Sequence, residues 1–266
     1  MTAAAPPDLE VDAERRFGGL RRLYGDAGYA RLRGARVAVV GLGGVGSWAA
    51  EALARSGVAA LVLIDLDHVA ESNINRQVQA LGRTLGQAKA IALAERIADI
   101  HPGCQVSAVE DFVEPSNWPA LLRQPVDVLI DACDATRAKL ALAAWSLHGR
   151  VPLVCVGAAG GKRMAQRVEV EDLAGVTHDP LLAGLRQRLR RDHGAPRQGR
   201  IGVRCVFSRE AVAAPADGCV MGDGSLNCHG YGSSVAVTAT FGMVAAGEAI
   251  TLLLACDTEA NLQHIM

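Results

Sequence analysis

Aromatic residues and net charge are both scarce in this sequence. Phe, Trp and Tyr together make up 4% of the 266 residues, and the formal net charge is −1 at pH 7. A charge so close to zero gives no global attraction for nucleic acid, so any such binding requires a local basic patch. Half of the residues are hydrophobic and 29 are Gly, a composition typical of helices packed closely on a parallel sheet.

Signatures of zinc, disulfides and secretion are also missing. The cysteines number seven, and no two of them are spaced Cys-x-x-Cys, which argues against a zinc ribbon or a redox motif. The N-terminus has no basic start followed by an apolar stretch, so no signal peptide is predicted. We therefore expect a reducing, cytoplasmic environment.

One stretch, residues 235–256, is long and apolar enough to suggest a membrane span. It contains Glu248 and two internal glycines. A charge near the bilayer centre costs about 2.5–3.5 kcal/mol on insertion scales. We therefore predict a buried core helix and no membrane partner.

Short apolar strands alternate with helices along most of the chain. This pattern predicts an α/β fold with a doubly wound, Rossmann-like and mostly parallel sheet, followed by a C-terminal elaboration. We expect a disordered N-terminus (1–13), a single domain (14–256) and a tail (257–266). The nucleotide motifs lie at 36–160 and the elaboration at 161–256. The expected strands are 36–40, 61–65, 106–109, 126–131, 152–157, 168–170 and 203–207, and the expected helices are 14–33, 47–56, 85–100, 136–148 and 181–190.

A glycine-rich loop follows the first predicted strand and opens a helix. Its residues are Gly41, Leu42, Gly43, Gly44, Val45 and Gly46. In this context the glycines permit a tight turn and close approach of a phosphate, and the helix N-terminus offers free N–H groups. Asp65 ends the next strand, where an acid meets ribose hydroxyls. These two features alone would favour an NAD-dependent oxidoreductase.

The segment after Asp65 shifts the balance toward a triphosphate. Asn73, Arg76, Gln77 and Lys89 supply amides and cations that a dinucleotide does not need but ATP does. The alternative for Arg76 and Lys89 is a solvated helix face. We predict ATP as the nucleotide, with Arg76 and Lys89 in catalytic roles.

Acids at the ends of two strands are candidate Mg²⁺ ligands. Asp67 follows the second strand and Asp134 follows a later buried one, at the strand ends where ligands bind in such sheets. Asp131, at the end of that later strand, is a candidate cofactor contact. Asp134 is the predicted metal ligand and a candidate catalytic residue. The alternative for Asp134 is an N-cap of the helix that starts at Thr136.

Five motifs in this order resemble the ubiquitin-activating superfamily. They are Gly-Leu-Gly-Gly-Val-Gly-Ser-Trp (41–48), Ile-Asp-x-Asp-x-Val (64–69), Ser-Asn-x-Asn-Arg-Gln (72–77), Lys89 and Asp-Ala-x-Asp (131–134). The resemblance implies that Asp65 holds the ribose and that Asn73, Arg76 and Lys89 contact the phosphates. It also implies Mg²⁺ on Asp134 and a homodimer, with an N-terminal arginine reaching the partner's site. Arg16 and Arg22 are candidates for that arginine.

Within the superfamily, the chain resembles the tRNA threonylcarbamoyladenosine dehydratase family over nearly its whole length. Residues 16–19, 22–25, 205–208 and 237–242 carry this likeness. The resemblance implies activation of a threonine carboxylate on tRNA by ATP, followed by ring closure with release of AMP and pyrophosphate. A neighbouring carbamoyl group can attack the activated carboxyl intramolecularly, which is a large proximity advantage.

The alternative within the superfamily is an adenylyltransferase for a ubiquitin-like sulfur carrier. Those enzymes usually carry two Cys-x-x-Cys pairs for zinc, and this chain has none. An arginine-rich stretch favours tRNA as the partner, because each phosphate contact adds affinity. The alternative for this stretch is a solvated face. Its candidate tRNA-binding residues are Arg186, Arg188, Arg190, Arg191, Arg197 and Arg200.

Cysteine and histidine residues complete the candidates. Cys228 lies beside a histidine in a glycine-rich stretch and is a candidate auxiliary nucleophile or persulfide acceptor, with a cysteine desulfurase or sulfur-acceptor protein as the corresponding partner. The alternative is a buried, inert thiol. His101 and His148 follow helical runs, where a partial positive charge is favourable.

Overall fold

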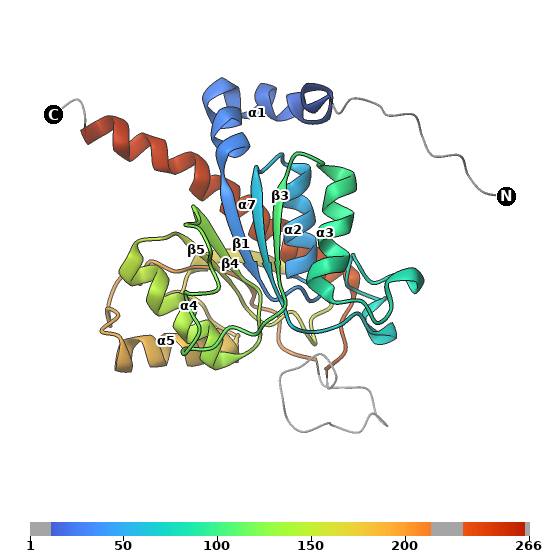
Figure 1. Cartoon of the computed structure of the whole chain (residues 1–266). Helices are drawn as coiled ribbons and strands as arrows, with labels where there is room; N and C mark the ends of the chain where they lie inside the picture. The colour runs from blue at the N-terminus through green and yellow to red at the C-terminus, as the bar shows by residue number, and fades with distance from the viewer. Residues whose placement is uncertain (1–11, 214–230, 264–266) are drawn as a thin grey trace.

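In the computed structural model, which describes residues 12–213 and 231–263, a seven-stranded sheet forms the centre (Figure 1). The strand order is β3-β2-β1-β4-β5-β7-β6, and every neighbouring pair is parallel except β6 with β7. The strands are β1 (Arg36–Val40), β2 (Ala60–Ile64), β3 (Gln105–Val109), β4 (Val128–Asp131), β5 (Leu153–Val156), β6 (Val168–Asp172) and β7 (Arg204–Ser208). The predicted doubly wound, mostly parallel sheet is confirmed.

Helices cover both faces of this sheet. They are α2 (Gly46–Arg55), α3 (Lys89–Ile100), α4 (Thr136–Gly149), α5 (Pro180–Asp192) and α7 (Val235–Gln263). α1 (Ala13–Gly34) packs against α7, and short 3₁₀ turns lie at Glu71–Asn73, Gly82–Thr84 and Ala165–Arg167. Successive β1 residues point to opposite faces, so Val37 and Val39 join the core under α2, α3 and α7, whereas Ala38 and Val40 join the core under α4 and α5. The strand faces are buried on both sides, as parallel sheets require.

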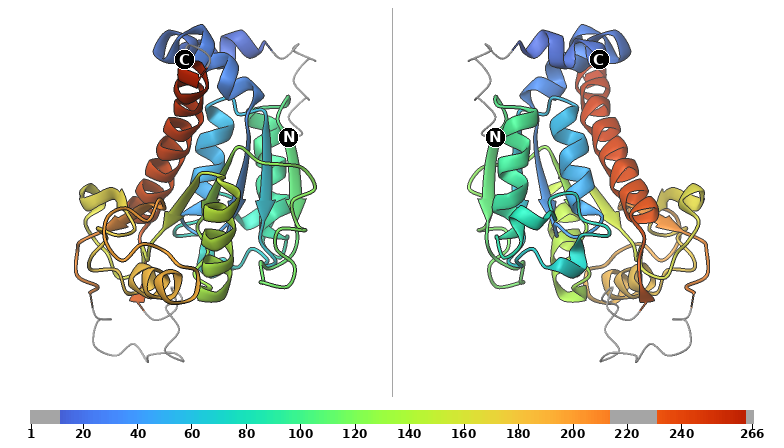
Figure 2. Two further views of the ribbon diagram at one scale, coloured as in Figure 1. Left: turned by 90° about the vertical axis from the view of Figure 1, so that its left-hand side faces the viewer. Right: turned by 90° about the vertical axis from the view of Figure 1, so that its right-hand side faces the viewer.

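α7 is a core helix that packs along α2. By length and composition alone, its residues Val235–Ala255 could cross a membrane, but half of that stretch is buried inside the protein. Gly242 lies against α2 so closely that a Cβ there would be 2.5 Å from the Val45 carbonyl oxygen. The far end of α7 meets α1, where Arg31 donates to the Leu253 carbonyl oxygen (Figure 2). This packing supports the predicted core helix.

α3 begins four residues later than predicted. The sequence pattern suggested a helix from residue 85, but Gly86 adopts a left-handed conformation (φ 81°). The backbone N–H groups of Gly86 and Lys89 donate to the carbonyl oxygens of Val69 and Asp67. These long-range bonds hold the segment in an extended path and delay the helix until Lys89.

His101 ends α3 in surroundings that disfavour its protonation. Its ring packs on Phe17 with a centroid distance of 4.6 Å, and Arg33 Nη1 lies 2.7 Å from its Nε2 atom. Burial lowers the His101 pKa, and the positive charges of Arg33 and Arg16 lower it further. The expectation of a favourable positive charge at this helix end is therefore wrong for His101.

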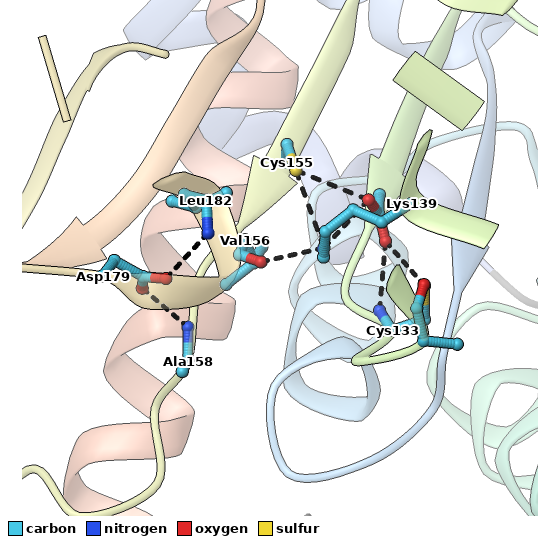
Figure 3. Close-up of polar contacts among 9 residues, drawn as sticks. Cys133, Lys139, Cys155, Val156, Ala158, Asp179 and Leu182 are labelled. Atoms are coloured by element: carbon cyan, nitrogen blue, oxygen red, sulfur yellow. Dashed lines mark hydrogen bonds and ion pairs between the residues drawn. The ribbon is translucent and has the colours of Figure 1, made fainter. Parts of the chain in front are cut away.

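α5 is anchored at its N-terminus by Asp179. The buried Asp179 carboxylate accepts hydrogen bonds from Leu182 N at 3.0 Å and from Ala158 N at 2.8 Å (Figure 3). A Cβ on Gly157 would lie 2.1 Å from Asp179 Oδ2, so only glycine fits there. One side chain thus caps α5 and fixes the loop that leaves β5.

Candidate active site

A cavity of about 610 Å³ opens at the carboxyl ends of β1 and β2. Gly41, Asp65 and Asp67 line it together with residues 111–116, Asp134 from the segment before α4, and the first turn of α4. This is the edge where ligands bind in open parallel sheets, and the volume suits a nucleotide-sized molecule. Gly41, Asp65, Asp67 and Asp134, all predicted from the sequence, therefore meet at one site.

The glycine loop has the shape of a phosphate cradle. Gly41 adopts a φ of 83°, and a Cβ on Gly46 would lie 1.8 Å from the Gly41 carbonyl oxygen. Gly43 has open space where a Cβ would stand, so a ligand can reach its backbone. The backbone N–H groups of Gly43, Gly44 and Val45 donate to no acceptor within the described residues. They are available to an anion at the N-terminus of α2.

Asp65 closes this loop from the end of β2. Its Oδ2 atom accepts from Leu42 N at 2.6 Å, and its Oδ1 atom accepts from Asp67 N at 2.9 Å. Burial raises the Asp65 pKa, against the opposing effects of the Lys89 charge and the two backbone hydrogen bonds. The carboxylate is thereby fixed in the cavity wall, where the sequence motif places a ribose ligand.

The predicted phosphate contacts Lys89 and Arg76 are not among the residues that line the cavity. Lys89 is buried, and its Nζ atom forms an ion pair with Asp67 Oδ2 at 2.7 Å. The Arg76 side chain packs against Gly44, and a Cβ on Gly44 would be 3.1 Å from the Arg76 Cγ atom. The Arg76 guanidinium donates to the Ser72 carbonyl oxygen at 2.7 Å, while its buried Nε has no acceptor among the described residues.

Two further predicted contacts serve the local turn. Asn73 is buried, and its Oδ1 atom accepts from Ala70 N at 3.0 Å. Gln77 is buried and accepts from Gln79 Nε2 at 3.3 Å. The Asn73 bond closes the 3₁₀ turn at Glu71–Asn73, which precedes Arg76 in the chain, and neither side chain lines the cavity. Their proposed contact with phosphates stays a prediction.

Asp131 does not line the cavity, although the sequence analysis placed it among the cofactor contacts. It is fully buried, and Lys139 Nζ donates to its Oδ2 atom at 2.9 Å and to the Val156 carbonyl oxygen at 3.0 Å (Figure 3). Asp131 Oδ1 accepts from the Cys133 backbone at 3.2 Å. The pair joins the ends of β4 and β5 and orients the Cys133–Ala135 segment in the cavity wall.

Sequence reasoning missed Lys139. Its only signal was position: Lys139 shares the buried face of α4 with Ala138, Leu142 and Ala143, where a charge requires a partner. The negative charge of Asp131 raises the Lys139 pKa against the opposing effect of burial, so the side chain stays charged.

Asp134 is exposed at the cavity and does not cap α4. The N-cap residue is Ala135, which makes no side-chain cap hydrogen bond, so the alternative N-cap role is wrong. Within residues 12–213 and 231–263, no three His, Cys, Asp or Glu side chains form a metal site. The chemistry of Asp134 and Asp67 fits a hard cation shared with phosphate oxygens, as Mg²⁺ is usually bound.

The arginine-rich stretch divides into inward and outward side chains. Arg186 donates to the carbonyl oxygens of Leu173 and Val176 at 3.0 and 2.7 Å, so it stabilises the fold. Arg190 donates to Pro196, and Arg191 pairs with Asp192. Arg200 lies 3.8 Å from Asp172 and borders a smaller cavity at the opposite end of the sheet.

Arg188 and Arg197 have no hydrogen-bond or ion-pair partner among the side chains and backbone that the structure describes. Their guanidinium groups are therefore available to a partner molecule.

The N-terminal arginines also differ. Arg16 donates to the carbonyl oxygens of Asp99 and Ile100 at 3.0 and 2.6 Å, where it satisfies the end of α3. Arg22 is exposed on α1. Cys228 lies outside the described residues.

The family model described as the ThiF family matches residues 17–266. The chain belongs to the ThiF family. It is 45% identical over 252 residues to the tRNA threonylcarbamoyladenosine dehydratase of Escherichia coli (strain K12), covering 91% of this chain and 94% of that protein. It is 39% identical over 246 residues to the Haemophilus influenzae enzyme of the same name, covering 91% and 94%. These similarities confirm the predicted family, the tRNA threonylcarbamoyladenosine dehydratases.

A solved structure of the Escherichia coli dehydratase in complex with ATP has the same fold. It superposes with a TM-score of 0.85 at 42% identity, and the match covers 94% of this chain and 99% of that one. The same enzyme has also been solved with AMP.

Proposed function

We propose that this chain uses ATP to dehydrate threonylcarbamoyladenosine in tRNA by adenylylating its threonine carboxylate. The decisive observation is the combination of an open glycine loop and Asp65 at the edge of the cavity. The near full-length similarity to dehydratases, one of them solved with ATP, supports the same substrate here. The sulfur-carrier alternative and an NAD-dependent activity have no comparable support.

The first step joins the carboxylate to AMP. A carboxylate oxygen attacks the α-phosphorus of ATP, and pyrophosphate leaves. The N–H groups of Gly43, Gly44 and Val45 bind the phosphates, and Asp65 accepts from the ribose hydroxyls. Lys89 and Arg76 stabilise the charge that develops as pyrophosphate departs, after the Arg76 guanidinium leaves the Ser72 carbonyl oxygen.

The second step closes the ring. The carbamoyl group attacks the acyl carbon and releases a proton to solvent, the bond between the acyl carbon and the oxygen on AMP breaks, and the former carboxylate oxygen departs with AMP. The nucleoside therefore loses the elements of one water overall. The attack is intramolecular and needs orientation rather than a protein nucleophile. Mg²⁺ would be held by Asp134 and Asp67, where it would neutralise the charge of the phosphates.

The remaining partner assignments belong to the same proposal. We infer a cytoplasmic homodimer in which Arg22 reaches the partner's site, because Arg16 is engaged with the end of α3 within its own chain. Arg188 and Arg197 would contact tRNA phosphates. A sulfur-transfer protein as a further partner would act through Cys228.

Mass spectrometry of tRNA nucleosides tests the proposal. After incubation of threonylcarbamoyladenosine-containing tRNA with protein and ATP, the nucleoside should lose the mass of one water and AMP should accumulate. Asp65→Ala should weaken ATP binding, whereas Arg76→Ala and Lys89→Ala should mainly slow turnover. An unchanged nucleoside, or full AMP production by both Arg76→Ala and Lys89→Ala, would contradict the assignment.

A further inference from the structure

The cavity has an unusual balance of charge. Five carboxylates line it, and Arg137 is the one cation among its described lining residues. The acids are Asp65, Asp67, Asp111, Glu114 and Asp134. Under the proposed function, this acidic cavity must admit ATP together with a second anion, the threonine carboxylate. The approach of that carboxylate to a phosphate therefore requires a cation on the substrate's side.

Arg137 is free to supply that charge. The two cations predicted to contact phosphates are engaged, because Lys89 is paired with Asp67 and Arg76 donates to the Ser72 carbonyl oxygen. Arg137 is exposed, and no residue in the described part of the chain accepts a hydrogen bond from it or pairs with it. It stands in the first turn of α4, directly before Ala138, which is buried against the sheet.

The position of Arg137 favours the substrate carboxylate over the terminal phosphates of ATP. Arg137 and Asp65 line the same cavity, whereas Gly43, Gly44 and Val45 lie outside its lining. If Asp65 binds the ribose and the loop binds the outer phosphates, Arg137 shares the ribose part of the cavity, and the α-phosphate stands between that part and the loop. That phosphate is the one attacked by the carboxylate.

We propose that Arg137 binds the threonine carboxylate of the tRNA nucleoside and aligns it for attack on the α-phosphorus. The planar guanidinium can donate two parallel hydrogen bonds to the two carboxylate oxygens, which fixes orientation as well as position. Arg137 thereby distinguishes the modified nucleoside from unmodified adenosine, which has no carboxylate. This inference rests on the proposed function.

A binding experiment with two tRNAs tests the inference. Affinity is measured for tRNA that carries threonylcarbamoyladenosine and for the same tRNA with plain adenosine. Arg137→Ala should weaken binding of the modified tRNA roughly ten-fold or more, as expected when a charge-assisted pair is removed, and leave the unmodified tRNA unaffected. Arg137→Lys should recover part of the affinity, because it keeps the charge without the fork. Arg123→Ala, an exposed arginine outside the cavity, is the matched control.

Three outcomes would overturn the inference. An equal loss of affinity for both tRNAs would assign Arg137 to a tRNA phosphate. A reduced ATP-induced rise in melting temperature, with tRNA binding intact, would assign it to the nucleotide. Wild-type affinity for both tRNAs would leave it without a binding role. The proposed function fails separately, if the wild-type protein produces no dehydrated nucleoside.

Discussion

Replacement of Lys139 by Met should destabilise the protein strongly. The side chains of Lys139 and Asp131 are 1% and 0% exposed, and their ion pair is 2.9 Å long. Met is an unbranched side chain only one atom shorter than Lys, but it leaves the Asp131 carboxylate buried without a counter-charge. Removal of one partner of a buried pair costs about 3–5 kcal/mol. For a domain of this size, each kcal/mol lowers the melting temperature by about 2–4 °C, so we expect a fall of roughly 6–20 °C.

Thermal unfolding of four proteins measures this effect. Alongside wild type and Lys139→Met, the double variant Asp131→Asn/Lys139→Met removes both charges and retains an oxygen for the Cys133 N–H, so it should recover much of the stability. Arg191→Met breaks an exposed pair with Asp192 and should leave the melting temperature unchanged. A fall of less than about 2 °C for Lys139→Met, or a double variant as unstable as the single one, would refute the reasoning.

The other predictions concern the glycine loop, pH and tRNA. Gly46→Ala places a Cβ 1.8 Å from the Gly41 carbonyl oxygen and should abolish the ATP-induced rise in melting temperature. A Cβ at Gly43 meets open space, so Gly43→Ala should fold normally. A wild-type ATP response of Gly46→Ala would contradict this prediction. Burial and the Arg33 and Arg16 charges lower the His101 pKa, so the unfolded state binds more protons and stability should fall as pH drops through about 6.5. In His101→Gln, the melting temperature should fall less between pH 8 and pH 5 than it does in wild type. Identical pH profiles for the two proteins would contradict this prediction. The double variant Arg188→Ala/Arg197→Ala should raise the KM for tRNA and leave the ATP affinity unchanged. Its salt slope, the slope of log tRNA affinity against log salt concentration, should be smaller by roughly 0.7–0.9 for each tRNA phosphate that the protein no longer neutralises. Arg186→Ala should instead reduce stability, and a wild-type salt slope in the double variant would withdraw this stretch from tRNA binding.

The local sequence pattern was sufficient to predict those features of the structure that a single physical requirement determines. The β1 strand was predicted at residues 36–40, as observed, because a short apolar run between Arg36 and Gly41 has one stable arrangement in a parallel sheet. The glycine loop was also predictable, because the left-handed φ of Gly41 and the close approach at Gly46 leave no room for another residue. Asp65, Asp67 and Asp134 meet at the cavity because the carboxyl ends of parallel strands share one edge.

The direction of side chains and their long-range partners were decided by tertiary structure alone. Asp131 and Asp134 are three residues apart in one motif, yet one is buried against Lys139 and the other faces the cavity. Arg186 and Arg188 belong to one basic stretch, but only Arg186 turns inward to backbone carbonyl oxygens. Sequence spacing determines which elements form and where they end. Which face of each element is buried, and which distant atom satisfies its polar groups, depends on how the elements pack together.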